Sequence, residues 1–114
     1  MFQTLRQVYL FYHQVKIEDG QISYVNFGKK GARVKIWGGV LAENITQAAC
    51  RDILTNRVLE CEKCGIPVRL HVHDEIVGEV GKKKAKAMQK VFDKILNTAP
   101  LWAEGFPLKT ESEI

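Results

Sequence analysis

The sequence has little proline and little cysteine, and it lacks a long hydrophobic run. Three prolines beside a hydrophobic content of 46% exclude collagen-like and disordered classes. Three cysteines are an odd number in a chain that can form an ordinary core, so reduced thiols are expected rather than a disulfide framework. No segment approaches the roughly 18 apolar residues of a membrane helix, and the start of the chain does not resemble a signal peptide. We therefore expect no membrane association and a cytoplasmic location.

The length and the net charge of the chain limit the number of domains and the kinds of partner that we expect. A chain of 114 residues is expected to form a single domain, residues 1–114, around one core. Seventeen basic against thirteen acidic side chains give a net charge of +4, which suits an anionic partner such as nucleic acid without requiring one. The sequence contains no phosphate-binding P-loop, no dinucleotide-binding glycine pattern and no Ser/His/Asp arrangement.

The first third of the chain has the composition of β-strands. Residues 7–17 are rich in Val, Tyr, Phe and Ile and lead to the turn dipeptide Asp19-Gly20, after which residues 22–27 form a second strand-like run. A third short run, residues 33–37, stops at Gly38-Gly39. The pattern predicts a hairpin with one added strand as a β-rich lead-in over residues 1–37.

A helical repeat follows over residues 41–64. Apolar residues recur every three or four positions, and Gly65 and Pro67 close the segment. The apolar positions are Leu41, Ile45, Ala48 or Ala49, Ile53, Val58 and Cys61. A polar stripe of Asn44, Gln47, Arg51 and Thr55 shares the other side. A solvated face and a binding face both fit this stripe.

The last half of the chain combines strands with a second helix. Residues 67–80 form two apolar runs separated by His73-Asp74-Glu75, which predicts a tight β-hairpin. Helical spacing then continues over residues 82–98, and the tail is expected to pack through Trp102, Phe106 and Leu108. We therefore expect an α+β fold in which a small antiparallel sheet is backed by the two helices.

Two adjacent carboxylates at the predicted turn are candidates for chemistry. Strands that flank a turn can hold Asp74 and Glu75 rigidly at the rim of a sheet, and hard cations such as Mg²⁺ prefer oxygen ligands held in this way. A solvated turn is the alternative, because Asp is common in turns.

Two other clusters of side chains, one of cysteines and histidines and one of lysines, are also candidate binding sites. Cys61 and Cys64 precede His71 and His73, a set of side chains that could bind Zn²⁺, although only six residues separate Cys64 from His71. Lysines also crowd the start of the second helix, where the helix dipole disfavours cations, so that either a phosphate partner or a solvated face explains them. These are Lys82, Lys83, Lys84 and Lys86.

Three segments together resemble family A DNA polymerases. LHVHDEIVGEV is similar to the third polymerase motif, and GGVLAENITQAACRDIL is similar to the helix that leads to it in phage-type members. PLWAEGFPLKTE resembles the closing segment of such enzymes. The resemblance covers residues 38–111 and implies the C-terminal part of a polymerase palm that is phage- or prophage-encoded and acts in DNA replication in a bacterial cell.

The resemblance implies a role for individual residues. Asp74 matches the catalytic, metal-binding aspartate, and Glu75 matches its supporting acidic neighbour. His73 matches a histidine near the primer 3′ end, and Gln47 matches a glutamine that touches template and primer. Glu43 departs from the asparagine of the bacterial branch, so no minor-groove contact is transferred to it.

DNA proximity is inferred for Asn44 and Arg51 from their spacing alone, because they share a helix face with Gln47. The resemblance also implies two Mg²⁺ ions, primer-template DNA and a deoxynucleoside triphosphate. The second aspartate and the nucleotide-binding fingers helix have no counterpart before Gly38, so the remaining palm and fingers are expected on another part of a parent chain or on a separate chain. A non-catalytic nucleic-acid-binding or interaction module and a small zinc protein remain as alternatives.

Overall fold

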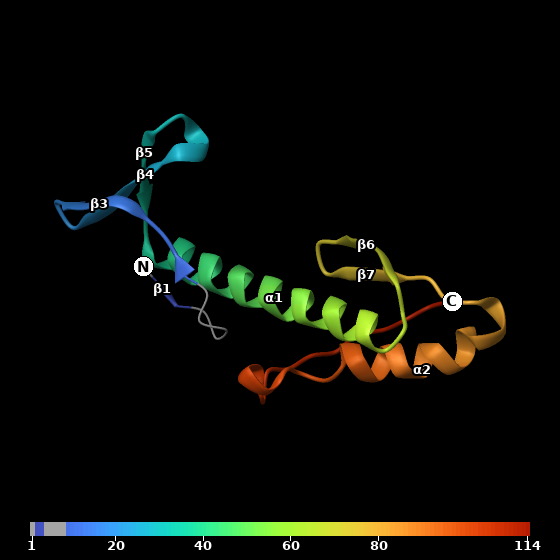
Figure 1. Ribbon diagram of the computed structural model, residues 1–114. Coiled ribbons are helices and arrows are strands. Elements are labelled where there is room, and N and C mark those ends of the chain that lie inside the picture. The colour runs from blue at the N-terminus through green and yellow to red at the C-terminus, as the bar shows by residue number, and fades with distance from the viewer. Residues whose placement is uncertain (1, 4–8) are drawn as a thin grey trace. The chain divides into compact units, whose positions relative to one another are not determined.

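The computed structural model describes residues 2–3 and 9–114 (Figure 1), and the chain divides into two compact units, Met1–Cys50 and Arg51–Ile114. The first unit contains β1 (Phe2–Gln3), β2 (Tyr9–Leu10), β3 (His13–Glu18), β4 (Gln21–Asn26), the 3-10 turn η1 (Phe27–Lys29), β5 (Ala32–Ile36) and the start of α1 (Gly38–Lys63). The second contains the rest of α1, then β6 (Val68–Val72), β7 (Glu75–Gly78), η2 (Lys82–Lys84), α2 (Ala85–Leu96) and η3 (Leu101–Ala103). The α+β prediction is confirmed, whereas the expected single domain stays a prediction.

Strands β3, β4 and β5 form an antiparallel sheet in the first unit. Asp19 and Gly20 both have positive φ angles, +49° and +75°, as the two-residue turn between β3 and β4 requires. The strand expected over residues 7–17 is divided, because β2 pairs with β1 while β3 pairs with β4. Residues 7 and 8 lie outside the described part of the chain. The hairpin and third strand of the lead-in are thus confirmed from β3 onward.

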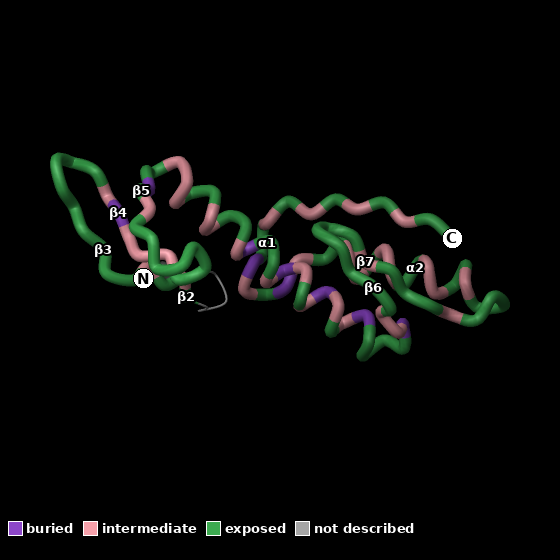
Figure 2. The backbone as a smooth tube through the Cα atoms, turned by 90° about the horizontal axis from the view of Figure 1, so that it is seen from above, coloured by how far each residue is buried: buried purple, intermediate pink, exposed green. Residues whose placement is uncertain are grey.

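This sheet buries little of its surface. All six residues of β3 are exposed, and Ser23 and Ile36 are the buried positions among residues 9–37 (Figure 2). Exposed aromatic side chains accompany it, including Phe11 at 65% and Phe27 at 64% exposure. The lead-in therefore exposes a large apolar surface to solvent and does not bury it in a core.

Helix α1 begins three residues earlier than its apolar repeat predicts, at Gly38. Its end agrees with the sequence. Gly65 has a φ angle of +78°, its N–H donates to the Glu62 carbonyl, and the Ile66 N–H donates to the Cys61 carbonyl at 2.9 Å. These two bonds form a Schellman motif, which satisfies carbonyls that the helix end leaves open.

The buried stripe of α1 repeats every fourth residue. Ile53 and Cys61 are buried as predicted, and Ala49 continues the stripe toward the start of the helix. Arg57 occupies the position between Ile53 and Cys61 and is only 8% exposed. A cation therefore lies where the sequence pattern suggests an apolar residue.

The predicted hairpin over residues 67–80 forms from β6 and β7, although β7 begins at Glu75 and ends at Gly78. A register irregularity lies within the ladder, between the Val68–Gly78 and Leu70–Val77 pairs. The helix expected over residues 82–98 is shorter, since Lys82–Lys84 form a 3-10 turn without a side-chain cap and α2 spans Ala85–Leu96.

The C-terminal tail returns along α2. The Gln89 amide donates to the Ser112 carbonyl at 3.1 Å, and the Thr110 N–H donates to the Asn97 side-chain oxygen at 2.9 Å. Trp102, Phe106 and Leu108 are half-buried, as their expected packing requires. Across the described residues, neither helix has the length and apolar character needed to cross a bilayer.

Candidate functional site

The candidate site is the two-residue turn of the β6–β7 hairpin. Val72 pairs with Glu75, so that His73 and Asp74 alone form the loop. His73 has a φ angle of +51°, a left-handed conformation that is uncommon for residues other than glycine. The turn is tight because two paired strands begin directly on either side of it.

Both carboxylates of the turn face solvent. Asp74 and Glu75 are exposed, and within the described chain no hydrogen bond or ion pair engages either carboxylate. Asp74 belongs to the turn itself, whereas Glu75 is the first residue of β7 and is fixed by the strand ladder. The Asp74 carboxylate is thus available to an external ligand.

The base of the hairpin is held against its surroundings in the second unit. A Cβ atom on Gly78 would lie 2.6 Å from a methyl carbon of Ile66, so only glycine permits this approach. The Val68 N–H donates to the Glu62 carboxylate at 2.6 Å, which ties β6 to the end of α1. These contacts anchor the end of the hairpin opposite the turn.

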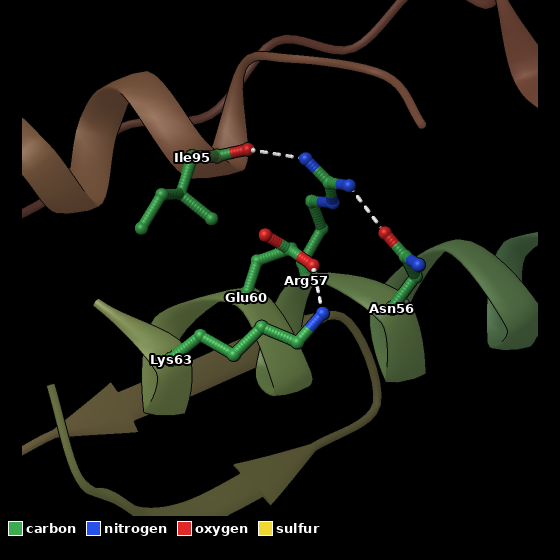
Figure 3. A network of polar contacts seen from close by, with 5 residues as sticks. All are labelled: Asn56, Arg57, Glu60, Lys63 and Ile95. Atoms are coloured by element: carbon green, nitrogen blue, oxygen red, sulfur yellow. Dashed lines mark hydrogen bonds and ion pairs between the residues drawn. The ribbon is translucent and has the colours of Figure 1, made fainter. Parts of the chain in front are cut away.

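A buried arginine joins the two helices of the second unit. The Arg57 guanidinium donates to the main-chain carbonyl of Ile95 at 3.1 Å (Figure 3) and to that of Thr98 at 2.5 Å. It also contacts the Asn56 side-chain oxygen. Arg57 thus adds a second donor to the Ile95 carbonyl, which also accepts from the Thr98 N–H at 3.3 Å, and it supplies a donor to the Thr98 carbonyl just beyond the end of α2. The local sequence pattern did not predict this contact, although an arginine within an apolar four-residue repeat was a signal for it.

One turn further along α1, Lys63 pairs with Glu60 at 2.8 Å (Figure 3). The hydrogen bond and the charge of Lys63 lower the pKa of the Glu60 carboxyl below its usual value. This exposed pair belongs to the solvated side of the helix rather than to the candidate site.

The predicted DNA-contacting residues of α1 differ in their surroundings. In the first unit, Gln47 is exposed, whereas Asn44 is half-buried and its amide donates to the Tyr12 hydroxyl at 2.9 Å. In the second unit, Arg51 is exposed, as is Thr55. The role of these residues in DNA binding stays a prediction, as do the roles of His73, Asp74 and Glu75.

The four candidate zinc ligands do not converge. No three of Cys61, Cys64, His71 and His73 gather into a group that could hold a metal ion. Cys61 is fully buried, and its burial, followed by the neighbouring Cys64, raises the pKa of its thiol to about 11. Zinc binds the thiolate, which this environment disfavours. The zinc alternative therefore lacks support in the geometry.

The donor set at the turn does fit one ligand of a magnesium site. Mg²⁺ commonly takes one or two protein carboxylates and completes its shell with water and substrate phosphates. Asp74 offers one exposed carboxylate on a short turn, and Glu75 lies next to it. A complete two-ion site needs more carboxylates than the hairpin supplies.

Sequence comparison relates most of the chain to a viral polymerase. A stretch of 82 residues, 72% of the chain, is 37% identical to the DNA polymerase of Bacillus phage SP02. The chain spans 12% of the length of that protein. No protein-family model matches the chain, and no solved structure matches it. The chain is thus similar to a segment of a phage DNA polymerase.

Proposed function

We propose that this chain is the C-terminal palm segment of a family A DNA polymerase and contributes Asp74 to template-directed nucleotide addition. The observation that carries the proposal is the position of Asp74. It stands in a two-residue turn, free of competing partners in the described chain, within a sequence related to a phage DNA polymerase.

Each side chain of the turn has a separate task in this proposal. Asp74 would hold Mg²⁺, and the bound metal would supply activation of the primer 3′-hydroxyl and neutralisation of phosphate charge. His73 lies near the primer end and orients it, while Glu75 supports the local charge. Gln47, exposed on α1, contacts template and primer. Substrates are primer-template DNA and a deoxynucleoside triphosphate.

The chain acts with the rest of a palm and fingers, on the same or a separate polypeptide. One face of the hairpin supports this need for a partner. Leu70 and Val77 are directly paired and are 54% and 49% exposed, and Val72 on the same face is 42% exposed. An apolar strand face of this kind is normally covered in a complete sheet protein.

Primer extension tests the proposal. The 114-residue chain is mixed with a second polypeptide that carries the remaining palm and fingers, and extension of a labelled primer is followed with Mg²⁺ and nucleotides. We expect extension with both chains and none with either alone. DNA binding without extension under all combinations would instead favour a non-catalytic nucleic-acid-binding module.

A further inference from the structure

A cavity of about 490 Å³ lies between the lead-in sheet and the first turns of α1, within the first unit. The hollow is open to solvent, so a flat ligand can reach it from outside. Its walls come from the segment before β3, from β4 and η1, and from α1 near Asn44 and Gln47. None of the residues that line the cavity belongs to the hairpin turn that carries Asp74.

Aromatic rings line much of this cavity. Tyr12 and Tyr24 meet edge to face with centroids 5.0 Å apart, and His13 meets Phe27 in the same way at 5.0 Å. Phe27 and Phe11 also border the cavity and remain mostly exposed. Exposed rings beside fixed rings form a surface on which a flat aromatic ligand can stack.

Amide groups border the same space. Asn44 is oriented by its hydrogen bond to the Tyr12 hydroxyl, and the side chains of Asn26 and Gln47 also line the cavity. An amide offers a donor and an acceptor together, the pattern that nucleobase edges present. Stacking surface and amides therefore occur in one site.

The net charge of the lead-in, which forms part of the cavity wall, favours an anionic chain. Residues 9–37 contain five lysines and arginines against two acidic residues, a net charge of +3. Lys29 and Lys30 directly follow Phe27 and are exposed. A site that combines aromatic faces with neighbouring lysines has the features of single-stranded nucleic-acid binding.

We infer that this cavity binds an unpaired base of single-stranded DNA. The base stacks against Phe27 or Phe11, its edge meets the amides of Asn44 and Gln47, and the adjoining phosphates lie beside Lys29 and Lys30. The inference shares Gln47 with the DNA contact of the proposed function, but its test needs neither Mg²⁺ nor a complementing chain, so its failure is distinguishable from a failure of primer extension.

The test uses the full chain and a short oligothymidine that carries one central 2-aminopurine. Stacking quenches 2-aminopurine fluorescence, so quenching reports insertion of the base and anisotropy reports affinity. Phe27→Leu is expected to weaken binding about tenfold and to relieve quenching, the loss of one stacking partner. Phe11→Leu tests the second exposed ring of the cavity in the same way. Trp37→Leu is the matched control, since Trp37 is 69% exposed and does not line the cavity.

Salt dependence separates phosphate contacts from stacking. Replacing Lys29 and Lys30 together by Gln should reduce the slope of log affinity against log salt by about 1.4, with quenching retained at saturation. The same change at Lys90 and Lys94, exposed on α2, should leave the slope unchanged. The inference is overturned if the unaltered chain fails to bind the oligonucleotide or binds it without quenching. It is also overturned if both phenylalanine variants bind as tightly as the unaltered chain.

Discussion

Val72 and Glu75 pair directly across the β6–β7 hairpin, so only His73 and Asp74 lie between them along the chain. A loop of two residues has few conformations open to it once both strands are paired. The Asp74 carboxylate is therefore carried by the turn at the edge of a small sheet. This arrangement is what a metal-binding role for Asp74 requires.

The left-handed backbone of His73 predicts an unusual order of substitutions. His73→Gly should hold or slightly raise the free energy of unfolding, because glycine adopts a positive φ without strain. His73→Val should lower it by about 1 kcal/mol, because a β-branched residue fits this conformation poorly.

Urea denaturation of both variants measures this effect. The matched control is the same pair of changes at His71, which lies in β6 with extended backbone. There the order should reverse, since valine suits a strand better than glycine. The same order at both positions would show that the turn backbone does not constrain residue 73.

Arg57 is predicted to stabilise the second unit more than any surface cation. Arg57→Met removes the guanidinium hydrogen bonds to the Ile95 and Thr98 carbonyls and should lower the free energy of unfolding by about 2 kcal/mol. Arg69→Gln breaks an exposed pair with Glu79 and should cost less than about 1 kcal/mol. Thermal and urea unfolding compare the two variants, and equal losses would refute a bridging role for Arg57.

Cys61 is predicted to resist thiol reagents and to impose a pH dependence on stability. Its folded pKa is raised from 9.0 to about 11, so the folded chain retains a proton that the unfolded chain releases. The stabilisation from this difference is complete below pH 9.0 and is lost as the pH rises toward about 11.

A variant with Ser at positions 50 and 64 isolates this thiol, because the other two cysteines are exposed. Its labelling by an aromatic disulfide reagent at neutral pH should be slow until denaturant is added. Rapid labelling of the folded variant would mean that the thiol is accessible.

The exposed face of the hairpin is predicted to bind the rest of the polymerase. Leu70→Ser together with Val77→Ser should leave far-ultraviolet circular dichroism unchanged, because both side chains are about half exposed. Association with the complementing polypeptide should weaken at least tenfold by titration calorimetry. As a control, the same pair of changes at exposed Ile17 and Val15 on β3 should have no effect on association.

Local signals made much of the fold predictable. Asp19-Gly20 specifies a two-residue turn through its backbone preferences, and Gly65 ends α1 in a Schellman motif. Apolar periodicity located α1, α2 and the β6–β7 hairpin to within a few residues. The position of Asp74 between two strands was predictable for the same reason, since short apolar runs bounded it on both sides.

Long-range contacts were not predictable in this way. Arg57 bonds to carbonyls 38 and 41 residues away, and Asn44 bonds to Tyr12 at a separation of 32 residues. Nothing in the local pattern specifies such partners. The aromatic cavity likewise forms where the lead-in sheet contacts the start of α1. The periodicity of the sequence does not specify that contact.

The most direct measurement is single-turnover primer extension with Asp74→Asn in the complemented polymerase. The change removes the negative charge at nearly constant shape. We expect a loss of about 1,000-fold or more in the rate of nucleotide addition, with the fold unchanged, whereas Glu79→Gln in the same hairpin region should retain activity. Nucleotide addition at the parent rate by Asp74→Asn would exclude Asp74 from the reaction.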